Sequence, residues 1–234
     1  MLDQNVFIGF SKDTVQFFNR LKKHNERDWF QSRRDDYESY VLTPARSFVV
    51  DMGERLKQIS PNIQAVPKID KSLFRLNRDT RFSADKSPYK THMGIFFWEG
   101  QRPKMECSGF YFHLEPPHIM FGVGIYRFPK QDLHRFRKAA GDPDSGERLS
   151  QVIKTLSQLK GYDIGGKFYK RIPSGFDSNH PNSDLLLHNG LYAGKTVPIP
   201  DEMYSAELIN YCWKNFKSLA PLHLWLVENG IGFF

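Results

Sequence analysis

The chain has few cysteines, and none at the spacing of a metal or redox pair. Only Cys107 and Cys212 occur among its 234 residues, far apart in the sequence. A secreted disulfide scaffold and a cysteine-ligated zinc site are therefore both disfavoured. Each cysteine is best interpreted as a small buried hydrophobic residue.

Long hydrophobic runs are also missing. No apolar run approaches the roughly 18 to 20 residues that a membrane-spanning helix needs. The first five residues, MLDQN, have neither the basic flank nor the hydrophobic stretch of a signal peptide. We therefore expect a protein without a membrane segment, located in the cytoplasm.

Several well-known catalytic and cofactor motifs are absent. The sequence has no phosphate-binding or dinucleotide-binding glycine loop and no Gly-x-Ser-x-Gly. None of the eight histidines forms His-x-His or His-Glu-x-x-His, so their spacing predicts no metal site. The sequence identifies no cofactor and leaves the oligomeric state open.

What the chain does have is positive charge and phenylalanine. The formal net charge is +7, and there are 20 phenylalanines. A basic protein attracts anions, which include nucleic acid, phosphorylated metabolites and acidic partner proteins. The phenylalanines predict a largely aromatic core.

The pattern of apolar residues predicts one α+β domain over residues 1–234. Residues 10–60 read as helices, beginning at the caps Ser11, Asn25 and Thr43. Residues 68–126 are rich in strand patterns, including 93–98, 110–114 and 119–126. Residues 130–234 mix helices with a short strand at 168–172, and they end in two helices at 201–217 and 221–228. N-terminal and C-terminal helices would pack on a central, mainly antiparallel sheet.

One segment, residues 75–91, concentrates the charged chemistry of the chain. It contains five cations, Arg75, Arg78, Arg81, Lys86 and Lys90, but only two carboxylates, Asp79 and Asp85. Arginine presents a planar fork of donors that matches carboxylate or phosphate oxygens. If 73–78 is a strand, the arginines gather at one end of the sheet. The excess of cations favours an external anion, while the alternative is an internal network of ion pairs.

The same segment resembles the defining motif of a family of bacterial and fungal proteins that is catalogued as a domain of unknown function. That motif reads R-x-x-R-D-x-R-F-x-x-D-K-x-P-Y-K-T, and the chain matches all its fixed positions: Arg75, Arg78, Asp79, Arg81, Phe82, Asp85, Lys86, Pro88, Tyr89, Lys90 and Thr91. Residues 24–30, HNERDWF, are similar to the family's Asn-x-x-x-Trp-Phe segment. The resemblance covers nearly the whole chain. One departure is Tyr126, where the family's glycine-rich strand usually ends in tryptophan.

These observations lead to a functional hypothesis with alternatives. We expect a phosphorylated or otherwise anionic small ligand to bind Arg75, Arg78, Arg81, Tyr89 and Lys90. If the protein is an enzyme, phosphoryl transfer or hydrolysis fits best, with Asp79, Asp85 and Lys86 as catalytic candidates. The alternatives are a nucleic-acid-binding module, since aromatic residues lie among the cations, and a protein-interaction domain with a basic patch.

Overall fold

An antiparallel sheet of five strands lies at the centre of the structure, a computed structural model that describes residues 6–176, 179 and 181–233. The spatial order is β1-β2-β3-β5-β4. The strands are β1 (Met93–Glu99), β2 (Ser108–Glu115), β3 (His118–Ile125), β4 (Tyr162–Lys167) and β5 (His188–Pro198). Residues 1–5, on which the signal-peptide expectation depends, lie outside the described part.

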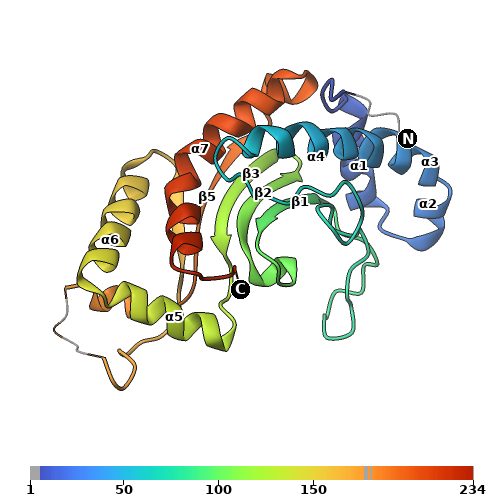
Figure 1. The fold of residues 1–234 in the computed structure, drawn as a ribbon. Helices are drawn as coiled ribbons and strands as arrows, with labels where there is room; N and C mark the ends of the chain where they lie inside the picture. The colour runs from blue at the N-terminus through green and yellow to red at the C-terminus, as the bar shows by residue number, and fades with distance from the viewer. Residues whose placement is uncertain (1–5, 177–178, 180, 234) are drawn as a thin grey trace.

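Helices from both ends of the chain cover one face of this sheet (Figure 1). The longest is α7, which contacts β2, β3 and β5 as well as α4. The α-helices are α1 (Lys12–Lys23), α2 (Arg27–Gln31), α3 (Arg34–Tyr37), α4 (Thr43–Leu56), α5 (Lys130–Ala140), α6 (Pro143–Gln158) and α7 (Glu207–Glu228). The predicted α+β class, with helices at both ends packed on an antiparallel sheet, is confirmed.

The core lies between the sheet and these helices because side chains alternate across each strand. In β2, Phe110, Phe112 and Leu114 are fully buried, whereas Tyr111 and His113 point to the opposite face. The rings of Phe112 and Phe48 lie 5.0 Å apart, which joins β2 to α4. The largest fully buried side chains are mostly phenylalanines, so much of the core is aromatic, as predicted.

Some of the helix boundaries and turns follow from short sequence patterns. Ser11 caps α1, with its Oγ accepting from the backbone N–H of Thr14 at 3.3 Å. The predicted cap at Thr43 is wrong, because the π-helical segment Glu38–Leu42 runs directly into α4 and Thr43 is itself helical. Pro44 lies in the first turn of α4. The hairpin of β2 and β3 turns at Pro116–Pro117, as the flanking aromatic runs predicted.

Two predicted strands were wrong. Residues 168–172 are not a strand, and the sheet is instead completed by β4 and β5. Both strands contain glycines, which lower strand propensity and hid them in the sequence. The segment 73–78 is not a strand either, since it makes only isolated bridges, such as Leu73 with Ile95 and Asn77 with Tyr89.

The end of the chain forms one helix where two were predicted. Pro221 lies inside α7. A proline removes one helical hydrogen bond, a cost of about 3 kcal/mol. Burial of Leu219, Leu222 and Trp225 on either side of it offsets that cost and carries the helix through.

The sequence predicted that the protein has no membrane-spanning segment. Among the described helices, none combines the length and apolar character that a membrane crossing requires.

Candidate functional site

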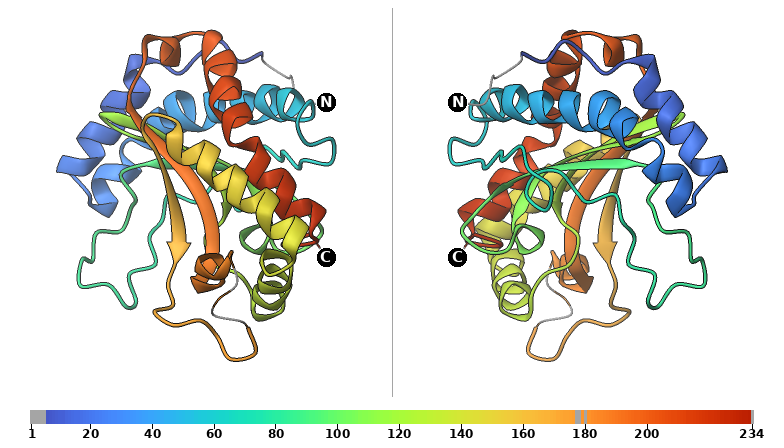
Figure 2. Two further views of the ribbon diagram at one scale, coloured as in Figure 1. Left: turned by 90° about the vertical axis from the view of Figure 1, so that its left-hand side faces the viewer. Right: turned by 90° about the vertical axis from the view of Figure 1, so that its right-hand side faces the viewer.

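Figure 2 shows the sheet from two further sides, with α4 in blue and α7 in red on one of its faces. The opposite face carries a groove of about 720 Å³. Its floor is largely glycine, contributed by four strands: Gly109, Gly122, Gly124, Gly165 and Gly194. The strand register places Gly109 opposite Gly124 and Gly122 opposite Gly194. A ligand can lie directly on the backbone at Gly122, where an added Cβ would meet nothing nearer than 3.6 Å, whereas the rings of Tyr192 and Phe96 lie over Gly165 and Gly109.

Aromatic residues form the walls of this glycine-floored groove. Phe74 and Phe96 lie at one side, Tyr111 stands on β2, and Tyr126 and Tyr192 lie at the other side with their ring centroids 5.3 Å apart. Tyr126 is 74% exposed although it is aromatic. An apolar hollow with a few polar groups is typical of a small-molecule site.

Positive charge gathers at the Phe74 side of the groove. The ammonium groups of Lys104 and Lys90 lie 4.2 Å and 5.7 Å from the centroid of the Phe74 ring. Burial lowers the pKa of Lys90, and the charge of Arg75 lowers it further. Burial also lowers the pKa of Lys104, and Lys90 adds to the effect while Asp70 opposes it. The two ammonium groups therefore repel each other beside an apolar ring.

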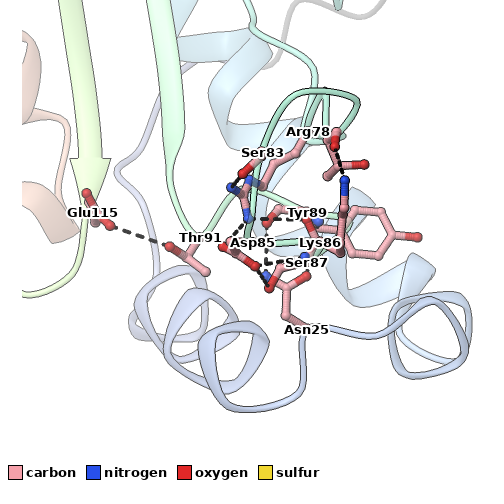
Figure 3. A network of polar contacts seen from close by, with 10 residues as sticks. Asn25, Arg78, Ser83, Asp85, Lys86, Ser87, Tyr89, Thr91 and Glu115 are labelled. Carbon is pink, nitrogen blue, oxygen red and sulfur yellow. Dashed lines mark hydrogen bonds and ion pairs between the residues drawn. The ribbon is translucent and has the colours of Figure 1, made fainter.

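The charged motif itself forms a long loop beside the groove, and ion pairs organise its interior (Figure 3). Arg78 pairs with Asp85 and also donates to Ser83 Oγ at 3.4 Å. Asp85 accepts from the hydroxyl and the backbone N–H of Ser87 at 2.6 Å and 2.9 Å. These bonds from Ser87, followed by Arg78, lower the pKa of Asp85 to about 2. Asp85 is therefore ionised at neutral pH.

The other two catalytic candidates also have partners within the loop. Asp79 accepts from Arg81 at 3.0 Å and 2.7 Å, and these bonds lower the pKa of Asp79. Lys86 donates to the carbonyl of Thr80 at 2.9 Å. Neither the two aspartates nor Lys86 lines the groove. Their catalytic role stays a prediction.

The predicted ligand-binding residues fall in different places. Lys90 lines the groove, and it is the one among the eight predicted site residues to do so. Arg75 is exposed near it, and Lys90 Nζ donates to the carbonyl of Arg75 at 3.0 Å. Tyr89 is only 5% exposed and packs on Phe30, with ring centroids 4.3 Å apart. The packing of Tyr89 is thus a structural contact, and its role in binding remains untested.

Asn25 joins the two sequence segments that carry the family resemblance. Its amide donates to the carbonyl of Tyr89 at 2.9 Å and accepts from the Tyr89 N–H at 3.1 Å. Asn25 was predicted to cap α2, and this prediction is wrong, because Glu26 stands at the cap position. Together with Phe30, it holds the end of the charged loop against the N-terminal helices (Figure 3).

Two histidines whose spacing in the sequence predicted no site come together at one end of the groove. His92, which lines the groove, and His113 have ring centroids 4.5 Å apart. Tyr111 Oη lies 2.9 Å from His113 Nδ1, and Glu115 lies 3.5 Å from the other ring nitrogen. Burial lowers the pKa of His92 to about 4 and also lowers the pKa of His113. Both imidazoles are therefore neutral near pH 7.

The sequence contains a pattern that predicts part of this histidine group, namely the alternation of residues along a strand. His113 and Glu115 are alternate residues of one strand and share a face. Met93 pairs with Leu114, so His92 lies just before the partner strand and beside Glu115. The register of the hairpin, which spacing alone does not give, brings the three residues together.

A second polar cluster is fully buried on the helix side of the sheet. His223 of α7 lies 2.9 Å from Ser108 Oγ through Nδ1 and 3.0 Å from Glu99 through Nε2. Ser60 also bonds Glu99. These residues are between 0% and 4% exposed, so no substrate reaches the serine. The cluster ties α7 to β1 and β2 and serves the fold.

Comparison with known proteins identifies a family but no activity. A family model described as a conserved hypothetical protein, DUF2461, matches residues 13–225. A search of curated proteins finds no match. The match spans α1 to most of α7 and includes the groove, the charged loop and the histidine group.

Proposed function

The chain belongs to the conserved hypothetical protein family DUF2461, and we propose that it binds a small anionic ligand with a flat apolar body in the glycine-floored groove. The observation that carries this proposal is the pair of ammonium groups of Lys90 and Lys104, both close to the ring of Phe74, which lines the groove together with Lys90. An anion between them would relieve their mutual repulsion. Charge-assisted hydrogen bonds to such an anion are stronger than neutral ones.

The shape of the groove supports a ligand with a flat apolar body. A backbone floor between aromatic walls accepts a planar or ring-shaped group, because aromatic faces stack with centroids about 4.5 to 7 Å apart. Phe74 and Phe96 supply such faces near the lysines, and Tyr192 supplies one on the far side. A nucleoside monophosphate and an aromatic carboxylate both have this combination of a charged end and a flat body.

A binding screen tests the proposal directly. Thermal shift and calorimetry would compare nucleotides, sugar phosphates and aromatic carboxylates. The affinity of the best ligand should fall at least about tenfold in Lys90→Ala, since a hydrogen bond to a charged group contributes about 1.5 to 3 kcal/mol. The matched control is Lys86→Ala, an exposed lysine of the same loop outside the groove. Equal affinity in both variants, or no ligand in any class, would contradict the proposal.

A hydrolytic or phosphoryl-transfer reaction is the finer form of this proposal. Such reactions depend mainly on positioning and charge stabilisation, and Lys90 would supply the charge. Asp79 and Asp85 would need to approach the groove through movement of the loop. Turnover of a phosphomonoester that disappears in Asp85→Asn while ligand affinity persists would support this form. Persistent turnover in the variants of both aspartates would argue against it.

An exposed phenylalanine favours single-stranded nucleic acid as a second candidate ligand. Phe82 is 96% exposed at the tip of the charged loop, with the guanidinium of Arg81 5.7 Å from its centroid. Bases stack on exposed rings while cations contact the phosphates. Binding would weaken steeply with salt and would be reduced by Phe82→Ala but not by Ile8→Ala, an exposed residue elsewhere. Absence of binding at low salt would remove this candidate and leave an acidic protein partner as the alternative.

A further inference from the structure

We propose that His92, His113 and Glu115 form a binding site for one divalent transition-metal ion, with Zn²⁺ as the probe ion. One ligand atom from each of the three residues can be chosen so that all lie within 4.8 Å of one another. Two imidazoles and one carboxylate form a ligand set that suits zinc and its neighbours in the first transition row. This site goes beyond the proposed ligand groove and requires no anionic ligand.

The fold builds this site from rigid parts. His113 and Glu115 stand on the same face of β2, and His92 immediately precedes β1, the strand paired with it. Thr91 Oγ1 donates to Glu115 Oε1 at 3.4 Å, which links the two strands at this end (Figure 3). Ligands on a strand are held more accurately than ligands on loops, and His92 is only one residue away from the paired strand.

The protonation state of the histidines is the one that a metal needs. Only neutral imidazole coordinates a metal, and burial keeps both rings neutral near pH 7. Tyr111 Oη contacts Nδ1 of His113, so when that nitrogen donates to it, Nε2 presents its lone pair toward Glu115. An outer hydrogen bond of this kind fixes the ring of a metal-binding histidine.

The distances require a small adjustment rather than a rebuilt site. Ligand atoms of a tetrahedral zinc ion lie about 3.4 Å apart, given bonds of about 2.0 to 2.1 Å. His113 Nε2 and Glu115 Oε2 already lie 3.5 Å apart. Glu115 is half-exposed, so its side chain has room to turn. Three protein ligands leave one coordination position open, as in catalytic zinc sites.

Nearby charge makes Glu115 the most important ligand. Burial is the main cause of the low pKa of His92, and the nearby cations Lys90 and Arg78 lower it further. These cations also disfavour an added metal charge. Glu115 acts in the opposite direction. Removing its charge therefore weakens binding through both the lost bond and the uncompensated repulsion.

Metal titration of the full chain tests the proposal. Protein treated with a chelator should bind about one equivalent of Zn²⁺ in calorimetry, and Co²⁺ should give the absorption spectrum of a four-coordinate site. Glu115→Gln and His113→Ala should each weaken Zn²⁺ binding at least about a hundredfold, and Tyr111→Phe about tenfold. His134→Ala, which removes an exposed histidine on α5, is the control and should bind as the parent does.

The controls separate this proposal from a misfolded variant and from the ligand groove. Glu115→Gln preserves the size of a half-exposed side chain, so circular dichroism should match the parent. Lys90→Ala, which is expected to weaken binding of the anionic ligand, should still bind the metal ion. No binding by the parent, or undiminished one-equivalent binding in Glu115→Gln and His113→Ala, would overturn the metal site and show that the three residues form a hydrogen-bonded group only.

Discussion

At the scale of single residues, Asn25 shows how one side chain fixes a charged loop. Its amide makes two hydrogen bonds with the backbone of Tyr89, 64 residues away in the chain. Main-chain groups are paired in this way wherever sheet partners are missing. The end of the loop is therefore held by a contact that is independent of the ion pairs among its arginines and aspartates.

Loss of the Asn25 amide should destabilise the protein measurably. Asn25→Ala removes both bonds and leaves two backbone groups of Tyr89 partly buried without partners. The expected loss in the free energy of unfolding is about 2 kcal/mol, from about 1 kcal/mol for each bond. Urea denaturation measures it, with Asn210→Ala as the control, because Asn210 is exposed and bonds Glu207 on its own helix. A loss no larger than that of the control would contradict the clamp.

Gly122 and Gly124 lie close together on β3, but the fold requires glycine at only one of the two positions. A Cβ atom at Gly122 would meet its nearest neighbours, Tyr111 Cβ and the Ala193 carbonyl, at 3.6 Å and 3.8 Å, which are ordinary contacts. The fold does not require glycine at this position. By contrast, Gly124 has φ +111° and a Cβ would lie 2.2 Å from the Leu191 carbonyl. Gly122 thus keeps the groove open, whereas Gly124 is needed by the backbone.

The two glycines therefore give a matched pair of variants. Gly122→Leu should fill the groove and abolish ligand binding while changing the free energy of unfolding by less than about 1 kcal/mol. Gly124→Leu should lower the free energy of unfolding by about 1 to 3 kcal/mol or more because of backbone strain. Thermal denaturation and ligand titration of both variants check this. Unfolding of Gly122→Leu would show that its glycine serves the fold.

At the scale of elements, the buried cluster around His223 holds α7 on the sheet. Helix α7 packs over β2, β3 and β5, and the hydrogen bonds of His223 reach Glu99 on β1 and Ser108 on β2. Polar groups at this depth are stable only when they are fully paired. The cluster therefore specifies where along the sheet the helix docks.

A substitution of Glu99 should show how much the buried cluster contributes to the free energy of unfolding. Glu99→Ala leaves His223 and Ser60 buried without their shared partner, and we expect the free energy of unfolding to fall by about 3 kcal/mol. Glu228→Ala, on the same helix as His223, breaks an exposed ion pair with Arg148 and should change it by less than about 1 kcal/mol. Equal effects in chemical denaturation would mean that the buried cluster contributes little.

At the scale of the whole molecule, pH acts on stability through buried histidines. His188 at the start of β5 is 6% exposed, and its Nδ1–H donates to the Leu185 carbonyl at 3.1 Å. Burial lowers the pKa of His188 in the folded state. The unfolded chain, with a histidine pKa of about 6.5, therefore binds more protons as the pH falls below that value.

Stability should consequently decrease on acidification. The contribution of His188 is complete above about pH 6.5 and is lost as the pH falls toward its lower folded pKa. Urea denaturation at pH 7.5 and at pH 5.5 measures how much the free energy of unfolding falls between these two pH values. In His188→Gln that part of the pH dependence should disappear, whereas His134→Ala should retain it. An unchanged slope in His188→Gln would assign the acid sensitivity to other groups.

The sequence by itself determined the class of the fold and the position of its local signals. Ser11, Pro44 and the aromatic alternation of 110–114 act within a few residues, and such short-range signals can be read directly from the chain. The same reading identified the charged segment at 75–91 and the family, which the match over residues 13–225 confirms. It predicted eight site residues, and Lys90 among them lies in the groove.

Tertiary structure decided everything that depends on register and long-range pairing. The glycines of β3, β4 and β5 lower strand propensity, so only their pairing in the sheet reveals them as a floor. His92 meets His113 because β1 pairs with β2, and Asn25 meets Tyr89 because the helices fold back on the loop. Contacts between different strands leave no periodic trace in a sequence, and the groove is built from such contacts.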